Sequence, residues 1–342
     1  MGFFNMEILK VVFVIIGTLI GAGFASGQEI YTFFFSFGIK GLFGIAITSI
    51  LIGITIYKTL KIIDRNNVKS YKEFLDCIIK SKRIKKIVNI LVNIFILASF
   101  YIMIAGFGAY LEQEFNLNNI IGSGILAILC LYIFKTNIRG LVKANEILIP
   151  ILIAVVIFIG IINIKNIDIK NIDNYLIQTN NKNWIIKSIL YASYNMILLM
   201  PVLTSLEEYI TKEKNIKFIS IIVSIIVSIL LSTVFLFLIN VDVNIKNLEM
   251  PAVYAISNIW PNIKNIYGII ILISIFTTAI SLGISFLKDA SKNTKQYNVM
   301  SILICITSVL FSNIGFSNLV NLLYPILGVL GLLQILQILL KG

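Results

Sequence analysis

Long apolar runs follow one another along most of the sequence, and they limit the possible folds more than any other feature. Ten of them are predicted to be transmembrane helices, since about 20 apolar residues cross a bilayer core. The runs cover residues 8–37, 39–60, 86–111, 119–135, 139–163, 184–209, 216–240, 264–288, 297–313 and 316–340. The polar stretches Asn163–Asn183 and Val241–Asn262 are expected to be connections. The sequence therefore predicts an all-α membrane protein with one transmembrane domain over residues 1–342.

Composition excludes a soluble globular protein. The chain is 58% hydrophobic and 13% charged, whereas soluble domains are about a quarter charged. In a bilayer this composition is suitable, because lipid is the solvent of the outer face. Cys77, Cys130 and Cys305 form no CxxC pair, and histidine is absent. Neither a disulfide framework nor a metal site is expected, and no cofactor.

Basic residues are distributed unevenly between the two ends of the predicted spans. With the N-terminus inside, 21 of the 28 Lys and Arg residues fall on the cytoplasmic side, ten of them from Lys58 to Lys86. Cytoplasmic loops of membrane proteins carry such an excess. We expect a multi-pass protein of the cytoplasmic membrane with both termini in the cytoplasm. The net charge of +12 then belongs to a protein in a lipid bilayer, and no nucleic-acid partner is expected.

Helix-breaking residues recur between the two halves of the chain. Pro150 and Pro325 lie in the fifth and tenth spans, and glycines near Gly23 in the first span correspond to Asn195 and Pro201 in the sixth. Five spans are an odd number, so two such halves would face opposite ways in the membrane. The pattern predicts a 5+5 inverted repeat, roughly 8–163 and 184–340, as in many secondary transporters.

The first span contains the most informative stretch, Gly17–Glu29 (GTLIGAGFASGQE). Each glycine weakens a helix by about 0.8–1 kcal/mol relative to alanine. The run 8–37 would also extend about 45 Å as one helix, which exceeds a core of about 30 Å. A break in the helix resolves both problems, and broken backbone at membrane depth implies a cavity.

This break is a candidate binding site. Amides around Gly23–Gly27 would suit a carboxylate, and carbonyls around Leu19–Ala22 would suit a cation. Ser26 and Glu29 match a capping box that restarts the helix. The candidate substrate-binding residues here are Gly21, Ala22, Gly23, Phe24, Ala25, Ser26 and Gly27.

Two alternatives remain open for this stretch. Gly17, Gly21 and Ala25 also fit a small-residue packing face between helices. Glu29 is a functional candidate as an intramembrane carboxylate, but its role could equally be to complete the capping box near the outer interface.

The motif GTLIGAGFASGQEI resembles the signature of the YkvI-like membrane proteins, a group in the amino acid–polyamine–organocation superfamily. The resemblance extends over the whole chain. It implies the LeuT-type fold, with broken first and sixth helices. It also implies a secondary transporter of amino acids or related small amines or acids, driven by sodium ions or protons.

The resemblance also suggests site residues. Ser193 and Asn195 lie where the superfamily's second break falls, although Pro201 could simply kink a packed helix. Sodium-coupled members hold the ion with first-helix carbonyls, here Leu19 and Ala22, and with eighth-helix hydroxyls. Those hydroxyls would be Thr277, Thr278 and Ser281, which could instead bond to carbonyls of their own helix.

Tyr101 in the third span could contact the substrate or close the outer gate, or could be ordinary packing. Proton-coupled members have a lysine deep in the fifth helix, which this sequence lacks. Glu146 is a candidate proton carrier together with Glu29, but Glu146 could also pair with Lys143 or Arg139.

These observations favour a cation-coupled symporter for an amino acid or a related small amine or carboxylate solute. The alternative is a substrate-binding receptor or sensor subunit of the same fold without transport, similar to spore-germinant receptors. An enzyme is not expected, because the chain has no histidine and no aspartate within a predicted span. No span stands out as a dimer interface, so the oligomeric state is left open.

Overall fold

The computed structural model describes residues 6–165, 183–210, 213–239, 250–259, 261–312 and 316–341. Regular structure in these residues is entirely helical. Six helices are long and apolar enough to cross a membrane: α4, α6, α7, α9, α10 and α12. The helices are, in order, α1 (Met6–Leu19), α2 (Ala22–Ala25), α3 (Gln28–Phe33), η1 (Phe35–Phe37), α4 (Ile39–Asn66), α5 (Tyr71–Ile78), α6 (Lys82–Phe115), α7 (Asn119–Lys165), α9 (Trp184–Ser205), η2 (Glu207–Tyr209), α10 (Glu213–Leu238), α11 (Pro251–Ile259), η4 (Pro261–Ile263), α12 (Lys264–Ala290), α13 (Thr294–Phe311) and α14 (Phe316–Lys341).

Two predicted spans meet within α7. Its residue Asn137 has φ 58° and ψ −146°, so the chain turns there between the predicted spans 119–135 and 139–163. Asparagine tolerates positive φ better than most residues. The first predicted span, in contrast, is divided among α1, α2, α3 and η1. The number of unbroken helices therefore differs from the number of predicted spans.

The sixth span is where the prediction was wrong. α9 continues from Trp184 to Ser205 without a break at Asn195, and Pro201 lies inside it. Proline removes one helical hydrogen bond. The hydroxyls of Thr204 and Ser205 donate to the Pro201 carbonyl at 2.8 and 3.1 Å, which helps to complete the last turn.

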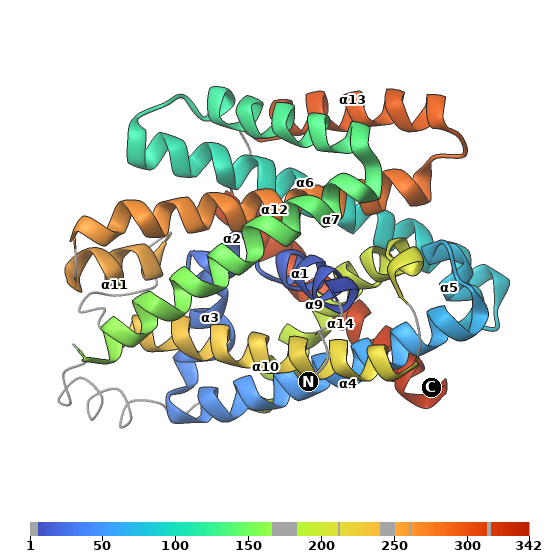
Figure 1. Cartoon of the computed structure of the whole chain (residues 1–342), viewed down its shortest axis with the longest axis horizontal. Helices are drawn as coiled ribbons and strands as arrows, with labels where there is room; N and C mark the ends of the chain where they lie inside the picture. The colour runs from blue at the N-terminus through green and yellow to red at the C-terminus, as the bar shows by residue number, and fades with distance from the viewer. Residues whose placement is uncertain are drawn as a thin grey trace.

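The stretch 241–262 also differs from expectation, because part of it is helical. Residues Pro251–Ile259 form α11, whereas most of the connection Asn163–Asn183 lies outside the described residues. Figure 1 shows α11 at the left end of the molecule and α5 at the right end, with α4, α10 and α12 running between them.

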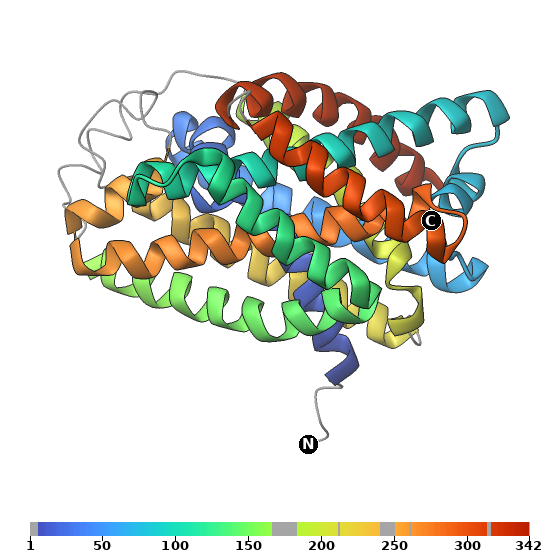
Figure 2. The same cartoon turned by 90° about the horizontal axis from the view of Figure 1, so that it is seen from above.

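α1 lies in the middle of this bundle, where it contacts α7, α9, α10 and α12. Figures 1 and 2 show these helices around it. α4 packs on both α9 and α10, and α14 packs on α9. The break in α1 is therefore surrounded by protein.

The outer faces of the long helices are apolar. Large exposed side chains include Ile54, Ile128 and Phe158. Many buried hydroxyls bond to carbonyls inside the protein, such as Thr48 Oγ1, which donates to Ser188 O at 2.9 Å. Such an apolar exterior is what a lipid solvent requires.

Candidate functional site

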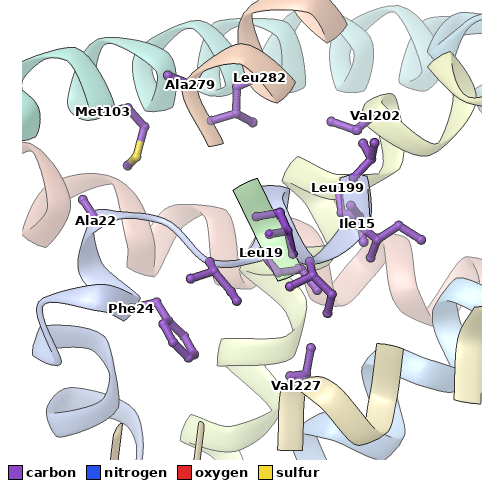
Figure 3. Packing of buried hydrophobic residues seen from close by; sticks show 14 of the residues in the cluster. Ile15, Leu19, Ala22, Phe24, Met103, Leu199, Val202, Val227, Ala279 and Leu282 are labelled. Carbon is purple, nitrogen blue, oxygen red and sulfur yellow. The ribbon is translucent and has the colours of Figure 1, made fainter. Parts of the chain in front are cut away.

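The first span is broken as the glycine pattern predicts. α1 ends at Leu19, Ile20 and Gly21 are non-helical, and α2 is a single turn. Figure 3 shows this extended segment, with Met103 and Ala279 on one side of it in this view and Phe24 and Val227 on the other.

A second irregularity follows α2 and changes the expected cap. The N-cap of α3 is Gly27, which has φ 81°, and not Ser26. The Ser26 amide donates to the Ala22 carbonyl at 2.9 Å, so the predicted capping box with Glu29 is not formed. The amides of Ala25 and Gly27 are likewise bonded, to Gly21 O and Phe24 O, so these amides do not point into a cavity.

α12 meets the break in α1 through Thr278. This hydroxyl lies 2.8 Å from the Gly17 carbonyl oxygen and 3.0 Å from that of Ile20, and the side chain is 4% exposed. The last carbonyls of a helix have no partner within it. Thr278 has one hydroxyl proton and therefore donates to only one of the two carbonyls at a time. The cluster thus holds more acceptor oxygens than protons.

The other predicted ion ligands lie differently. Thr277 Oγ1 bonds to carbonyls of its own helix, Ile273 O at 3.0 Å and Ser274 O at 3.1 Å. Ser281 Oγ donates to Thr277 O at 2.8 Å, again within α12.

The two carbonyls predicted to bind an ion are those of Leu19 and Ala22. The Ala22 carbonyl accepts a hydrogen bond from the Ser26 amide within the α2 turn, and Leu19 lines a small cavity. The carbonyls in contact with Thr278 are instead those of Gly17 and Ile20.

A small cavity lies beside the break and includes several predicted residues. Leu19, Phe24 and Asn195 line it together with Ile20 and Tyr191. Its volume is about 10 Å³, which is the space of roughly one water molecule. The Asn195 amide donates to Tyr191 O at 3.0 Å, within α9. This cavity therefore has no room for an amino acid.

Two predicted residues face elsewhere. Ser193 donates to Ile189 O within α9, and its own backbone packs against Gly331 of α14, where an added Cβ would lie 3.3 Å from Ser193 Cα. Tyr101 bonds to Thr307 of α13 at 2.5 Å. The structure therefore does not bring Ser193 or Tyr101 to the break.

Glu29 lies inside the protein. Its side chain belongs to α3 and is 5% exposed, and Tyr194 donates a hydrogen bond to Glu29 Oε2. The ring of Tyr191 packs edge-on against that of Tyr194, with centroids 5.2 Å apart. A Cβ on Gly23 would overlap the Glu29 carboxylate, so these two residues are in direct contact. The carboxylate is thus buried beside α2.

Glu146 on α7 is half-buried, and within the described chain it forms no ion pair with Lys143 or Arg139. Its neighbour Asn145 is fully buried and lies against Gly17. Asn145 Oδ1 has no hydrogen-bond partner among the described residues. An acceptor oxygen on α7 therefore lies against Gly17, one of the two residues whose carbonyls contact Thr278.

Three contacts at the break were not predicted. Met103 of α6 lies near Gly21, with its sulfur 3.5 Å from the position of an added Cβ. Tyr267 of α12 donates to Ala25 O at 2.7 Å. The Ala252 amide of α11 donates to Ser26 O at 2.8 Å. No sequence pattern links these residues, because they come from distant helices.

No family model matches this chain. The uncharacterized membrane protein YkvI of Bacillus subtilis (strain 168) is 28% identical over 323 residues, covering 93% of this chain and 91% of the relative. The uncharacterized protein YyaD of the same organism is 26% identical over 324 residues, covering 94% and 92%.

Solved structures of transporters share the fold. A substrate-bound, outward-open Na⁺-coupled sialic acid symporter matches with a TM-score of 0.67 at 14% identity, over 95% of this chain and 76% of the symporter. MhsT in complex with L-phenylalanine matches with a TM-score of 0.59 at 16% identity, over 89% and 78%. The chain is thus a homologue of the YkvI-like membrane proteins with the fold of LeuT-type transporters.

Proposed function

We propose that this protein is a secondary active transporter, a cation-coupled symporter of an amino acid or a related small amine or carboxylate solute. The observation that carries the proposal is the contact of the Thr278 hydroxyl with the Gly17 and Ile20 carbonyls at the break in the first span. A coupling ion that binds there would join α12 to the end of α1. Ion occupancy would then influence whether the break opens.

The donor atoms at this point suit sodium. All are oxygens, as a hard cation prefers. The Thr278 hydroxyl cannot donate to both carbonyls at once, and Asn145 Oδ1 lies nearby without a partner among the described residues. Thr277 and Ser281 could join the ion shell only after giving up bonds within α12. A proton remains the other candidate coupling ion, with Glu29 or Glu146 as its carrier.

Substrate would bind at the break after the small cavity widens. The residues proposed to line it are those of the segment 21–27 with Leu19 and Asn195, which already border the closed space or the break. Broken backbone inside a membrane protein supports this location, because transporters of this kind bind their substrates at discontinuous helices. We also propose that the chain forms ten spans in a 5+5 inverted arrangement and that both termini lie in the cytoplasm.

Uptake into proteoliposomes with and without a sodium gradient tests the function. Gradient-driven uptake of an amino acid or related solute is expected in the wild type. Thr278→Val keeps the shape of the side chain and removes the hydroxyl, so it should abolish sodium dependence. Thr55→Val is the matched control, because it removes a buried hydroxyl that bonds to Leu51 O within α4, and it should retain sodium dependence.

Other outcomes contradict the proposal in different ways. Binding without flux would favour the receptor or sensor alternative. Uptake driven by a pH gradient but indifferent to sodium would exclude the sodium site and leave the transporter assignment in place. Absence of both binding and uptake across amino acids, amines and small carboxylates would exclude both functions.

A further inference from the structure

A large polar cavity is lined by residues that lie far along the chain from the break in α1. Its volume is about 540 Å³. It is formed by the turn inside α7 around Asn137, the connection between α12 and α13, and Glu208 of η2. None of its lining residues borders the small cavity beside the break. The two cavities are therefore separate sites.

The charge of this cavity is strongly positive. Its lining includes four cationic side chains, Lys135, Arg139, Lys288 and Lys292, and one carboxylate, Glu208. These cations come from α7, from the end of α12 and from the connection that follows α12. Since like charges repel, a concave surface that gathers four of them favours an anion.

One residue of the lining also carries a hydroxyl that is buried. Tyr297 lines the cavity and is 9% exposed, and its hydroxyl has no hydrogen-bond partner among the described residues. A buried polar group without a partner costs about 1–3 kcal/mol, so a ligand that bonds to it recovers that free energy.

The first residues of α13 add to the preference for an anion. Asn293 caps this 18-residue helix by accepting from Gln296 N at 2.8 Å, and both Asn293 and Thr294 line the cavity. The N-terminus of a helix carries a partial positive charge.

We propose that this cavity binds a phosphate-bearing anion on the face predicted to be cytoplasmic. A phosphate group brings up to two negative charges and several acceptor oxygens, which match lysine, arginine and tyrosine donors converging from separate helices. A single carboxylate would leave most of these donors unused. The phosphate group could belong to a free anion or to the headgroup of an anionic lipid.

The position of the site gives it a regulatory role. Lys288 donates to the carbonyl of Ser205, the last residue of α9, at 3.1 Å, and Glu208 follows three residues after the end of α9. An anion bound to Lys288 and Lys292 would compete with the Ser205 carbonyl for the Lys288 ammonium group, which bonds to the end of α9. Occupancy of the cavity is therefore coupled to the position of that helix end.

Thermal unfolding of the purified full-length protein in detergent tests the site, with inorganic phosphate as the probe and chloride at matched ionic strength as the reference. Phosphate stabilises many proteins by exclusion from their surfaces, so the variants decide the result. A double variant, Arg139→Gln with Lys292→Gln, should weaken the apparent affinity for phosphate at least tenfold. Lys295→Gln removes one positive charge from α13 outside the cavity and should leave the affinity unchanged.

Tyr297→Phe is the sharpest variant. It removes only the unpartnered hydroxyl, so the ligand-free protein should melt at the wild-type temperature or higher, while phosphate should stabilise it less than it stabilises the wild type. A loss of ligand-free stability without any change in the phosphate effect would overturn the proposed contact.

Nanodiscs distinguish the two sources of the phosphate group. Without free phosphate, stabilisation by phosphatidylglycerol over phosphatidylcholine that disappears in the double variant would assign the site to a lipid headgroup. Equal stability in both lipids, together with stabilisation by inorganic phosphate, would assign it to a free anion. The proposal is refuted if neither probe stabilises the wild type more than the double variant, or if Lys295→Gln loses as much as the double variant.

Discussion

Gly17→Ala should destabilise the protein although it replaces glycine in a helix. An added Cβ would lie 3.0 Å from Ile149 Cδ1 and 3.1 Å from Asn145 Cγ, and closer still to Asn145 Oδ1. Asn145 cannot easily withdraw, because it is fully buried and its amide donates to Leu141 O at 2.9 Å. Overpacking of this kind lowers the free energy of unfolding by about 1–3 kcal/mol. The higher helix propensity of alanine raises it by up to about 1 kcal/mol.

The expected net loss is therefore up to about 2 kcal/mol in the free energy of unfolding, measured by denaturation of the purified protein in detergent. Gly124→Ala is the control, because no atom lies within 4 Å of its added Cβ. That variant should gain about 0.5–1 kcal/mol. Adding Asn145→Ala to Gly17→Ala should remove most of the stability loss caused by the clash. The two substitutions should therefore show a coupling free energy in a double-mutant cycle. The reasoning is refuted if Gly17→Ala and Gly124→Ala change stability alike.

Three further predictions follow from described contacts. Burial and the neighbouring Asp76 raise the pKa of the Cys77 thiol, so less thiolate is present at pH 7. A membrane-impermeant maleimide applied to inside-out vesicles should therefore label Cys77 more slowly than it labels a free peptide thiol, and the labelling rate should rise with pH. Asn137→Gly should keep or increase stability by up to about 1 kcal/mol, whereas Asn137→Val should lose about 1–3 kcal/mol, because φ is 58° at this position. Tyr267→Phe removes the bond to Ala25 O and should cost about 1 kcal/mol; an unchanged melting temperature would show that this bond contributes nothing to stability.

The break in the first span was predictable because its cause is local. Glycine weakens a helix wherever it occurs, and the run 8–37 was too long for one straight helix across the core. The expected break in α9 failed for the complementary reason. The sequence predicts an interruption at Pro201, but a proline near the end of a helix removes only its own bond to the carbonyl four residues earlier, and α9 continues past it to Ser205.

The neighbouring helix that each side chain contacts was not predictable from one sequence. Thr278 was a candidate from its hydroxyl, but its partners, Gly17 and Ile20, depend on the residue at which α1 ends. Ser193 and Tyr101 have suitable chemistry, but the Ser193 hydroxyl bonds within α9 and the Tyr101 hydroxyl bonds to Thr307 of α13. Which face of a helix meets which neighbour is set by packing among helices that are distant in sequence.

The contact between α11 and the first span has a consequence for sequence divergence. Ala252 donates its backbone amide to the backbone carbonyl of Ser26, and the Ala252 side chain meets Gly27, where an added Cβ would lie 3.0 Å away. A bond between two backbones is unaffected by most substitutions, and proline at 252 is the change that would delete it. Relatives that drift far apart in side chains can therefore keep this junction, provided that position 252 stays small and position 27 tolerates a positive φ.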